Sequence, residues 1–159
     1  MRKIWMMLLW FGLSACQATD TAQPTGSKEL LGVVSAQQIL QSYPEFSENY
    51  QRYTPSANEL AALKALEGKS LVVLFGGWCH DSEREVPRLL KVLDSLPGQL
   101  NELTFIAVNH NKQEPTGAHR RFELRYTPTF ILFDGTSELG RVIERPTLSL
   151  TEDLAAFLP

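Results

Sequence analysis

A reactive thiol is predicted at Cys79 because of what precedes and follows it in the chain. The short apolar run of residues 71–75 predicts a buried strand, and apolar residues recur at helical spacing from Ser82 onward. Cys79 is therefore expected where a strand turns into a helix. The free N–H groups and the partial positive charge at a helix N-terminus favour a thiolate, which is the nucleophilic form of cysteine.

The neighbours of Cys79 are expected to form a site with it. Trp78 supplies an apolar wall beside the sulfur. Ser82 follows three residues later on the same helical face, so we expect its hydroxyl to donate a hydrogen bond to the sulfur. An activated thiol of this kind is suited to thiol–disulfide exchange, in which a thiolate attacks a disulfide sulfur.

The segment Trp78-Cys79-His80-Asp81-Ser82 resembles the Trp-Cys-x-x-Cys site of thioredoxin-like proteins, with serine in place of the second cysteine. Pro87 matches the proline that kinks the active-site helix in that family, and Thr127-Pro128-Thr129 matches its cis-proline loop. The resemblance implies an α/β protein with a thioredoxin-like fold. This fold has a mixed central sheet flanked by helices and a cis-proline loop that faces the active site.

The same resemblance implies roles for individual residues. The catalytic positions would be Cys79, Ser82, Trp78 and Pro128. The positions that contact substrate would be His80, Asp81 and Thr127.

Ser82 limits the chemistry that the resemblance implies. In a dithiol thioredoxin the second cysteine releases the product, and Ser82 cannot do so because it would have to form a sulfur–oxygen bond. Val73 stands where the resemblance implies a buried aspartate that takes the resolving cysteine's proton. We therefore expect monothiol chemistry: Cys79 forms mixed disulfides with proteins or with glutathione-like small thiols, an outside thiol resolves them, and no cofactor is needed.

Two other functions stay open. A redox-inactive thioredoxin-like module would hold an extended client against the Cys79–Ser82 loop and the edge at Pro128 by strand-like pairing. A metal carrier would bind copper or zinc through Cys79, His80, Asp81 and His110. Consecutive residues at a helix start rarely converge on one ion, so no metal ligands are assigned.

The N-terminus has the pattern of a targeting segment. Arg2 and Lys3 precede an apolar stretch, residues 4–13, that is too short to span a membrane. The following Leu13-Ser14-Ala15-Cys16 resembles the lipobox of bacterial lipoproteins, which implies cleavage before Cys16 and acylation of that residue. Gln17 at the next position implies sorting to the outer membrane in a Gram-negative host, facing the periplasm. The alternative is an ordinary secretory signal with an incidental cysteine.

The chain is expected to divide into a lipoprotein signal peptide (1–15), a flexible tether (16–34) and a thioredoxin-like domain with a short N-terminal helical extension (35–159). Serine followed three residues later by Gln or Glu predicts helix starts at Ser35, Ser56 and Ser149. A further short helix is predicted over about 116–124. Strands are predicted at 50–54, 71–75, 103–108, 130–133 and 139–143, the last two joined through Asp134-Gly135 by a loop longer than two residues.

Composition excludes other classes of partner. Without Arg2 and Lys3, 13 basic residues remain against 18 acidic ones, a net charge of −5. No basic patch with interleaved aromatic residues is present, so nucleic acid is not an expected partner. No second apolar run approaches the ~20 residues of a membrane-spanning helix, so the lipid on Cys16 is the expected membrane attachment.

Overall fold

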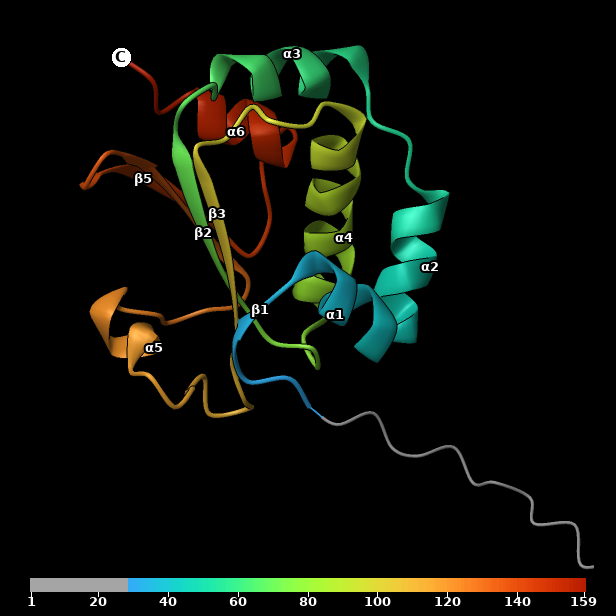
Figure 1. Cartoon of the computed structure of the whole chain (residues 1–159), viewed down its shortest axis with the longest axis vertical. Helices are drawn as coiled ribbons and strands as arrows, with labels where there is room; N and C mark the ends of the chain where they lie inside the picture. Colours follow the sequence, from blue (N-terminus) through green and yellow to red (C-terminus); the bar gives the residue numbers. More distant parts are fainter. Residues whose placement is uncertain (1–28) are drawn as a thin grey trace, which may run out of the picture.

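The computed structural model describes residues 29–159. The predicted signal peptide, Cys16 and most of the predicted tether lie outside the described residues. The elements along the chain (Figure 1) are β1 (Gly32–Val34), α1 (Ala36–Ser42), α2 (Pro44–Arg52), α3 (Ala57–Ala65), β2 (Ser70–Phe75), α4 (His80–Ser95), β3 (Glu102–Ala107), α5 (Ala118–Arg121), β4 (Thr129–Asp134), β5 (Ser137–Ile143) and α6 (Leu150–Ala155). Within this part of the chain, no helix is long and apolar enough to cross a membrane.

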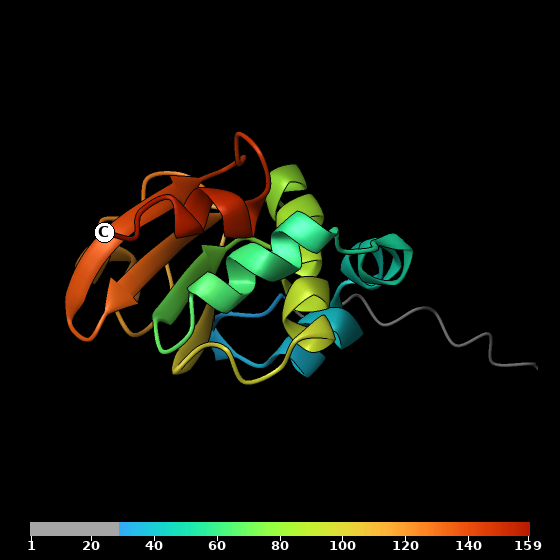
Figure 2. The same cartoon turned by 90° about the horizontal axis from the view of Figure 1, so that it is seen from above.

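The strands form a mixed five-stranded sheet in the order β1-β3-β2-β4-β5. Strands β2 and β3 run parallel, and the other neighbouring pairs are antiparallel. The long helix α4 lies with α3 and α6 on one face of the sheet, and the short α5 lies on the other (Figures 1 and 2). This is the predicted α/β architecture, a mixed sheet flanked by helices.

Strand β2 lies in the middle of the sheet and is buried on both faces, as its unbroken apolar run predicted. Side chains alternate between the faces of a strand. Leu71, Val73 and Phe75 accordingly belong to the large core beneath α4, whereas Leu74 belongs to a smaller cluster that includes Ala118 of α5. The central position of β2 fixes where its carboxyl end, and hence the following Cys79, must lie.

The prediction of a first strand over 50–54 was wrong. Residues 50–52 end helix α2, which begins with Pro44 at its first position and buries Phe46. Proline is favoured there because its fixed φ suits a helix and its missing N–H would be unpaired in any case. The first strand is β1, which pairs antiparallel with β3 at the sheet edge. The predicted tether therefore extended too far, since residues 32–34 belong to the sheet.

The three predicted helix caps are present, whereas one predicted turn and one predicted helix are shorter than expected. Ser35 and Ser56 cap α1 and α3 through complete capping boxes, and Ser149 caps α6. The turn between β4 and β5 is shorter than predicted, because Asp134 pairs directly with Ser137 and leaves a two-residue loop. Gly135 opens this loop with a φ of 58°, a conformation that favours glycine. The helix predicted over 116–124 is the shorter α5.

Candidate functional site

Cys79 is the N-cap residue of α4, so the predicted position of the thiol at a helix N-terminus is confirmed. The helix begins at His80, two residues earlier than the apolar spacing indicated, and it contains Pro87. The turn from β2 is closed by a hydrogen bond of 3.0 Å from the Cys79 N–H to the Gly76 carbonyl. Cys79 is partly exposed, and it is the free cysteine of the described residues.

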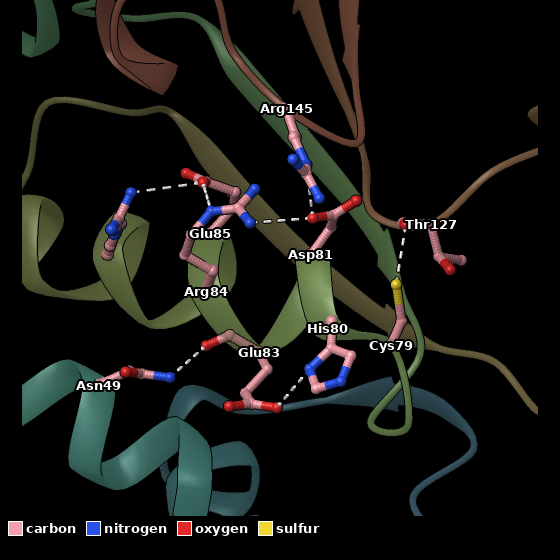
Figure 3. A network of polar contacts seen from close by, with 10 residues as sticks. Asn49, Cys79, His80, Asp81, Glu83, Arg84, Glu85, Thr127 and Arg145 are labelled. Carbon is pink, nitrogen blue, oxygen red and sulfur yellow. Dashed lines mark hydrogen bonds and ion pairs between the residues drawn. The ribbon is translucent and has the colours of Figure 1, made fainter.

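The cis-proline loop faces this thiol. The Thr127–Pro128 peptide bond is cis, and the Cys79 Sγ donates a hydrogen bond of 3.0 Å to the Thr127 carbonyl oxygen (Figure 3). Thr127 and Pro128 are both buried. The Pro128 carbonyl accepts a hydrogen bond of 2.8 Å from the Glu144 N–H, which holds the loop to the segment after β5. The structure thus brings together Cys79, Thr127 and Pro128 as the resemblance implied.

Ser82 has a different partner from the one predicted. It is fully buried, and its hydroxyl accepts a hydrogen bond of 3.3 Å from the Gly76 N–H. It makes no hydrogen bond with the Cys79 sulfur within residues 29–159. The hydroxyl therefore secures the turn between β2 and α4, where a buried N–H would otherwise lack a partner.

Trp78 covers the turn and stacks on His110. The two ring centroids lie 4.6 Å apart with an interplanar angle of 18°. The indole also lies so close to Gly76 that a Cβ there would come within 2.6 Å of the ring, which explains the glycine. The indole Nε1 is buried without a partner among the described residues. Sequence reasoning missed the contact of Trp78 with His110.

Asp81 is held by two arginines. Its Oδ1 pairs with Arg84 Nη1 at 3.0 Å and with Arg145 Nε at 2.9 Å (Figure 3). Arg84 also pairs at 2.5 Å with the buried Glu85. Burial alone would lower the pKa of Arg84, but the hydrogen bonds and charges of Glu85 and Asp81 raise it. Both pairs use Oδ1, so Asp81 holds the first turn of α4 to Arg145 through that one oxygen.

The side chains considered for a metal site are engaged elsewhere. His80 is 97% exposed, and its Nδ1 lies 3.4 Å from Glu83. Asp81 is paired with arginines, and His110 lies on Trp78. Across residues 29–159, no three His, Cys, Asp or Glu side chains are grouped so that they could hold a metal ion. The geometry of this region therefore gives the metal-carrier alternative no ligand set.

A second polar cluster shapes the loop that carries His110. Glu114 is buried, and its carboxylate accepts hydrogen bonds from the Thr116 N–H at 2.6 Å and the Thr116 hydroxyl at 2.7 Å. His119 Nδ1 lies 3.2 Å from the same carboxylate. Burial would raise the pKa of Glu114, but these hydrogen bonds lower it to about 2. Sequence reasoning did not identify Glu114, because its hydrogen bonds depend on the conformation of the loop and follow no recognised motif.

Glu114→Gln is expected to destabilise the protein by about 1–3 kcal/mol at neutral pH, since the buried carboxylate makes charge-assisted hydrogen bonds that the amide cannot replace in full. A carboxyl whose pKa is lowered by folding stabilises the protein above its unfolded pKa, and this contribution is lost as the pH falls from about 4.5 towards about 2. Urea unfolding of both proteins at several pH values will measure the difference. Glu67→Gln, at an exposed position, is the control. A destabilisation that persists undiminished near pH 2 would contradict the assignment to the Glu114 charge.

Comparisons with solved structures find proteins of similar fold. No family model matches the chain, and no curated protein matches it. The structure is similar to that of a protein of unknown function from Pseudomonas aeruginosa, with 19% identity, a TM-score of 0.51 and coverage of 78% of this chain and 75% of that one. An HIV epitope scaffold gives 17% identity, a TM-score of 0.51 and coverage of 78% and 87%.

Thioredoxin-2, a component of the malaria parasite protein secretion machinery, is more distant, with 20% identity, a TM-score of 0.44 and coverage of 56% and 79%. At such identities a likeness concerns the fold alone. The fold of this chain is thioredoxin-like: a mixed sheet flanked by helices, a cysteine at the start of the helix after β2, and a cis-proline just before β4.

Proposed function

We propose that this chain is a lipid-anchored, thioredoxin-like monothiol oxidoreductase that forms mixed disulfides through Cys79. One observation carries the proposal: the partly exposed Cys79 sulfur lies at the N-terminus of α4 and against the cis-proline loop, 3.0 Å from the Thr127 carbonyl. The described residues hold no second cysteine, and the chain's other cysteine, Cys16, is proposed below to carry lipid, so the product of the first attack would be resolved by another molecule.

The proposed reaction has two balanced steps. The Cys79 thiol loses its proton to solvent, and the thiolate attacks one sulfur of a substrate disulfide. A new sulfur–sulfur bond forms to Cys79 while the substrate bond breaks, and the other half leaves as a thiolate with the electron pair. In the second step an outside thiol attacks the mixed disulfide and restores Cys79, and that thiol becomes part of a new disulfide.

The Thr127 carbonyl has a role in this proposal. It accepts a hydrogen bond from the Cys79 thiol, and a thiolate has no hydrogen to donate. When Cys79 ionises, the carbonyl is released as an acceptor beside the reacting sulfur. An extended client can then donate a backbone N–H to it, as in strand-like recognition.

Mixed-disulfide trapping tests the proposal. The native protein, exposed to oxidised glutathione or to disulfide-containing client proteins, is expected to gain the mass of one thiol at Cys79. Cys79→Ser should show no such adduct under the same conditions. If the native Cys79 fails to react while the urea-unfolded protein reacts readily, the site is catalytically silent. The redox-inactive binding module, which would use the edge at the cis-proline Pro128, would then be the better function.

The lipid anchor is the second part of the proposal, and it is supported by the Leu13-Ser14-Ala15-Cys16 sequence. We propose that acylated Cys16 is the mature N-terminus and that the domain faces the periplasm, with the outer membrane favoured in a Gram-negative host. Intact-mass analysis of the membrane-bound protein should find a chain that starts at Cys16 and carries the added mass of acyl groups. Cys16→Ser should leave the membrane fraction. An unmodified Cys16 in a membrane-bound chain would refute the anchor.

A further inference from the structure

Five charged side chains form a connected network along the start of α4. Arg145 pairs with Asp81, Asp81 with Arg84, Arg84 with Glu85, and Glu85 with Arg88. Three guanidinium groups thus face these two carboxylates, and the charge of Arg88, at the far end of the network, also acts on the Glu59 carboxylate. The carboxylates are the hidden members, since the Asp81 side chain is 15% exposed and that of Glu85 is 4% exposed.

Arg145 is the member of the network that is open to solvent. Its side chain is 69% exposed, the highest value in the network. Only its Nε binds Asp81, and neither terminal nitrogen has a partner within residues 29–159. Figure 3 shows that Arg145 reaches the first turn of α4, the same end of the helix at which Cys79 lies. A guanidinium group with free terminal N–H groups is well matched to a carboxylate, because it can donate two parallel hydrogen bonds.

We propose that Arg145 makes the Cys79 site selective for anionic disulfides, in which a carboxylate lies close to the sulfur–sulfur bond. This inference rests on the proposed thiol–disulfide exchange and names its substrate class. Arg145 takes no part in bond making or breaking. It attracts the carboxylate and holds it while the Cys79 thiolate attacks the disulfide, and Asp81 keeps the guanidinium in place.

Two small aromatic disulfides of different charge test the selectivity. 5,5′-Dithiobis(2-nitrobenzoate) carries two carboxylates, whereas 4,4′-dithiodipyridine is neutral. The ratio of their rates with Cys79 is expected to fall by about two- to fivefold in Arg145→Gln at low salt, the size expected for losing one charge near the reagent. Arg145→Lys should keep most of the ratio, and added salt should lower it in the native protein. Arg52→Gln, which removes an exposed charge paired with Glu48, is the matched control, and Cys79→Ser is the blank.

The same variants distinguish two sources of the carboxylate. Oxidised glutathione represents a low-mass substrate, and a disulfide-linked peptide with amidated ends and a glutamate beside its cysteine represents a protein client. A loss confined to one of them in Arg145→Gln supports the proposal and identifies the source.

The outcomes separate this inference from the proposed function. A native protein in which Cys79 reacts with neither reagent refutes the proposed function itself. If Cys79 reacts with both, an unchanged rate ratio in Arg145→Gln overturns the selectivity. An equal slowing with both reagents also overturns it, because Arg145 would then act only by positioning α4 through Asp81.

Discussion

Ser82→Cys is expected to turn the monothiol site into a dithiol site. The introduced thiol would stand three residues after Cys79, in the first turn of α4, at the spacing of the Cys-x-x-Cys sites that this segment resembles. It could then attack the mixed disulfide at Cys79 and release the client without an outside thiol. Because this step becomes intramolecular, we expect insulin reduction with a dithiol donor to rise about tenfold or more over the native protein.

The structure also sets a bound on that gain. Ser82 is fully buried and accepts the Gly76 N–H, a role that a thiol fills only weakly. Val73, buried in the core, supplies no carboxylate to take the proton of the introduced thiol. We therefore expect the variant to remain slower than a thioredoxin that has such an aspartate.

Ser82→Ala is the matched control, since it removes the hydroxyl without adding a thiol. It should stay monothiol and accumulate the mixed disulfide with Cys79 as the native protein does. The dithiol interpretation is refuted if Ser82→Cys forms no internal disulfide under mild oxidant while Cys79 still reacts with a small disulfide. If Cys79 is also unreactive, the monothiol proposal fails as well.

The features predicted from the sequence are those whose causes lie close together in the chain. The helix caps at Ser35 and Ser56 depend on a partner three residues away. The burial of β2 depends on its own apolar run. The contact between Cys79 and Thr127 spans 48 residues, and it was anticipated because the resemblance to thioredoxin-like proteins supplied that pairing.

The features that were missed have causes far apart in the chain or signals too short to recognise. Arg145 reaches Asp81 across 64 residues, and nothing near Asp81 indicates that partner. Strand β1 has three residues, too few to display an alternating pattern. The Ser82 hydroxyl was assigned to the sulfur because spacing places both on one helical face, whereas the turn brings the Gly76 N–H to it.

Helix α2 was missed, since a strand was predicted over 50–54, yet the helix is packed into the domain. Phe46 is 1% exposed. Its ring centroid lies 5.1 Å from that of Tyr43 and 6.0 Å from that of Phe75, the last residue of β2. Asn49 Nδ2 also donates a hydrogen bond of 3.0 Å to the Glu83 carbonyl in α4 (Figure 3). These contacts connect α2 to the strand and the helix that flank Cys79.

Phe46→Ala is therefore expected to destabilise the domain by about 3–5 kcal/mol, because it removes a fully buried ring and leaves a cavity against β2. Urea unfolding followed by circular dichroism will measure the change, with the exposed Gln51→Ala on the same helix as a control expected to stay within about 0.5 kcal/mol. The rate of Cys79 alkylation in the folded variant will report whether the loss reaches the active-site turn. If Phe46→Ala is as stable as Gln51→Ala, α2 does not pack on the core, and the N-terminal helices would be an appendage to the sheet that carries the thiol.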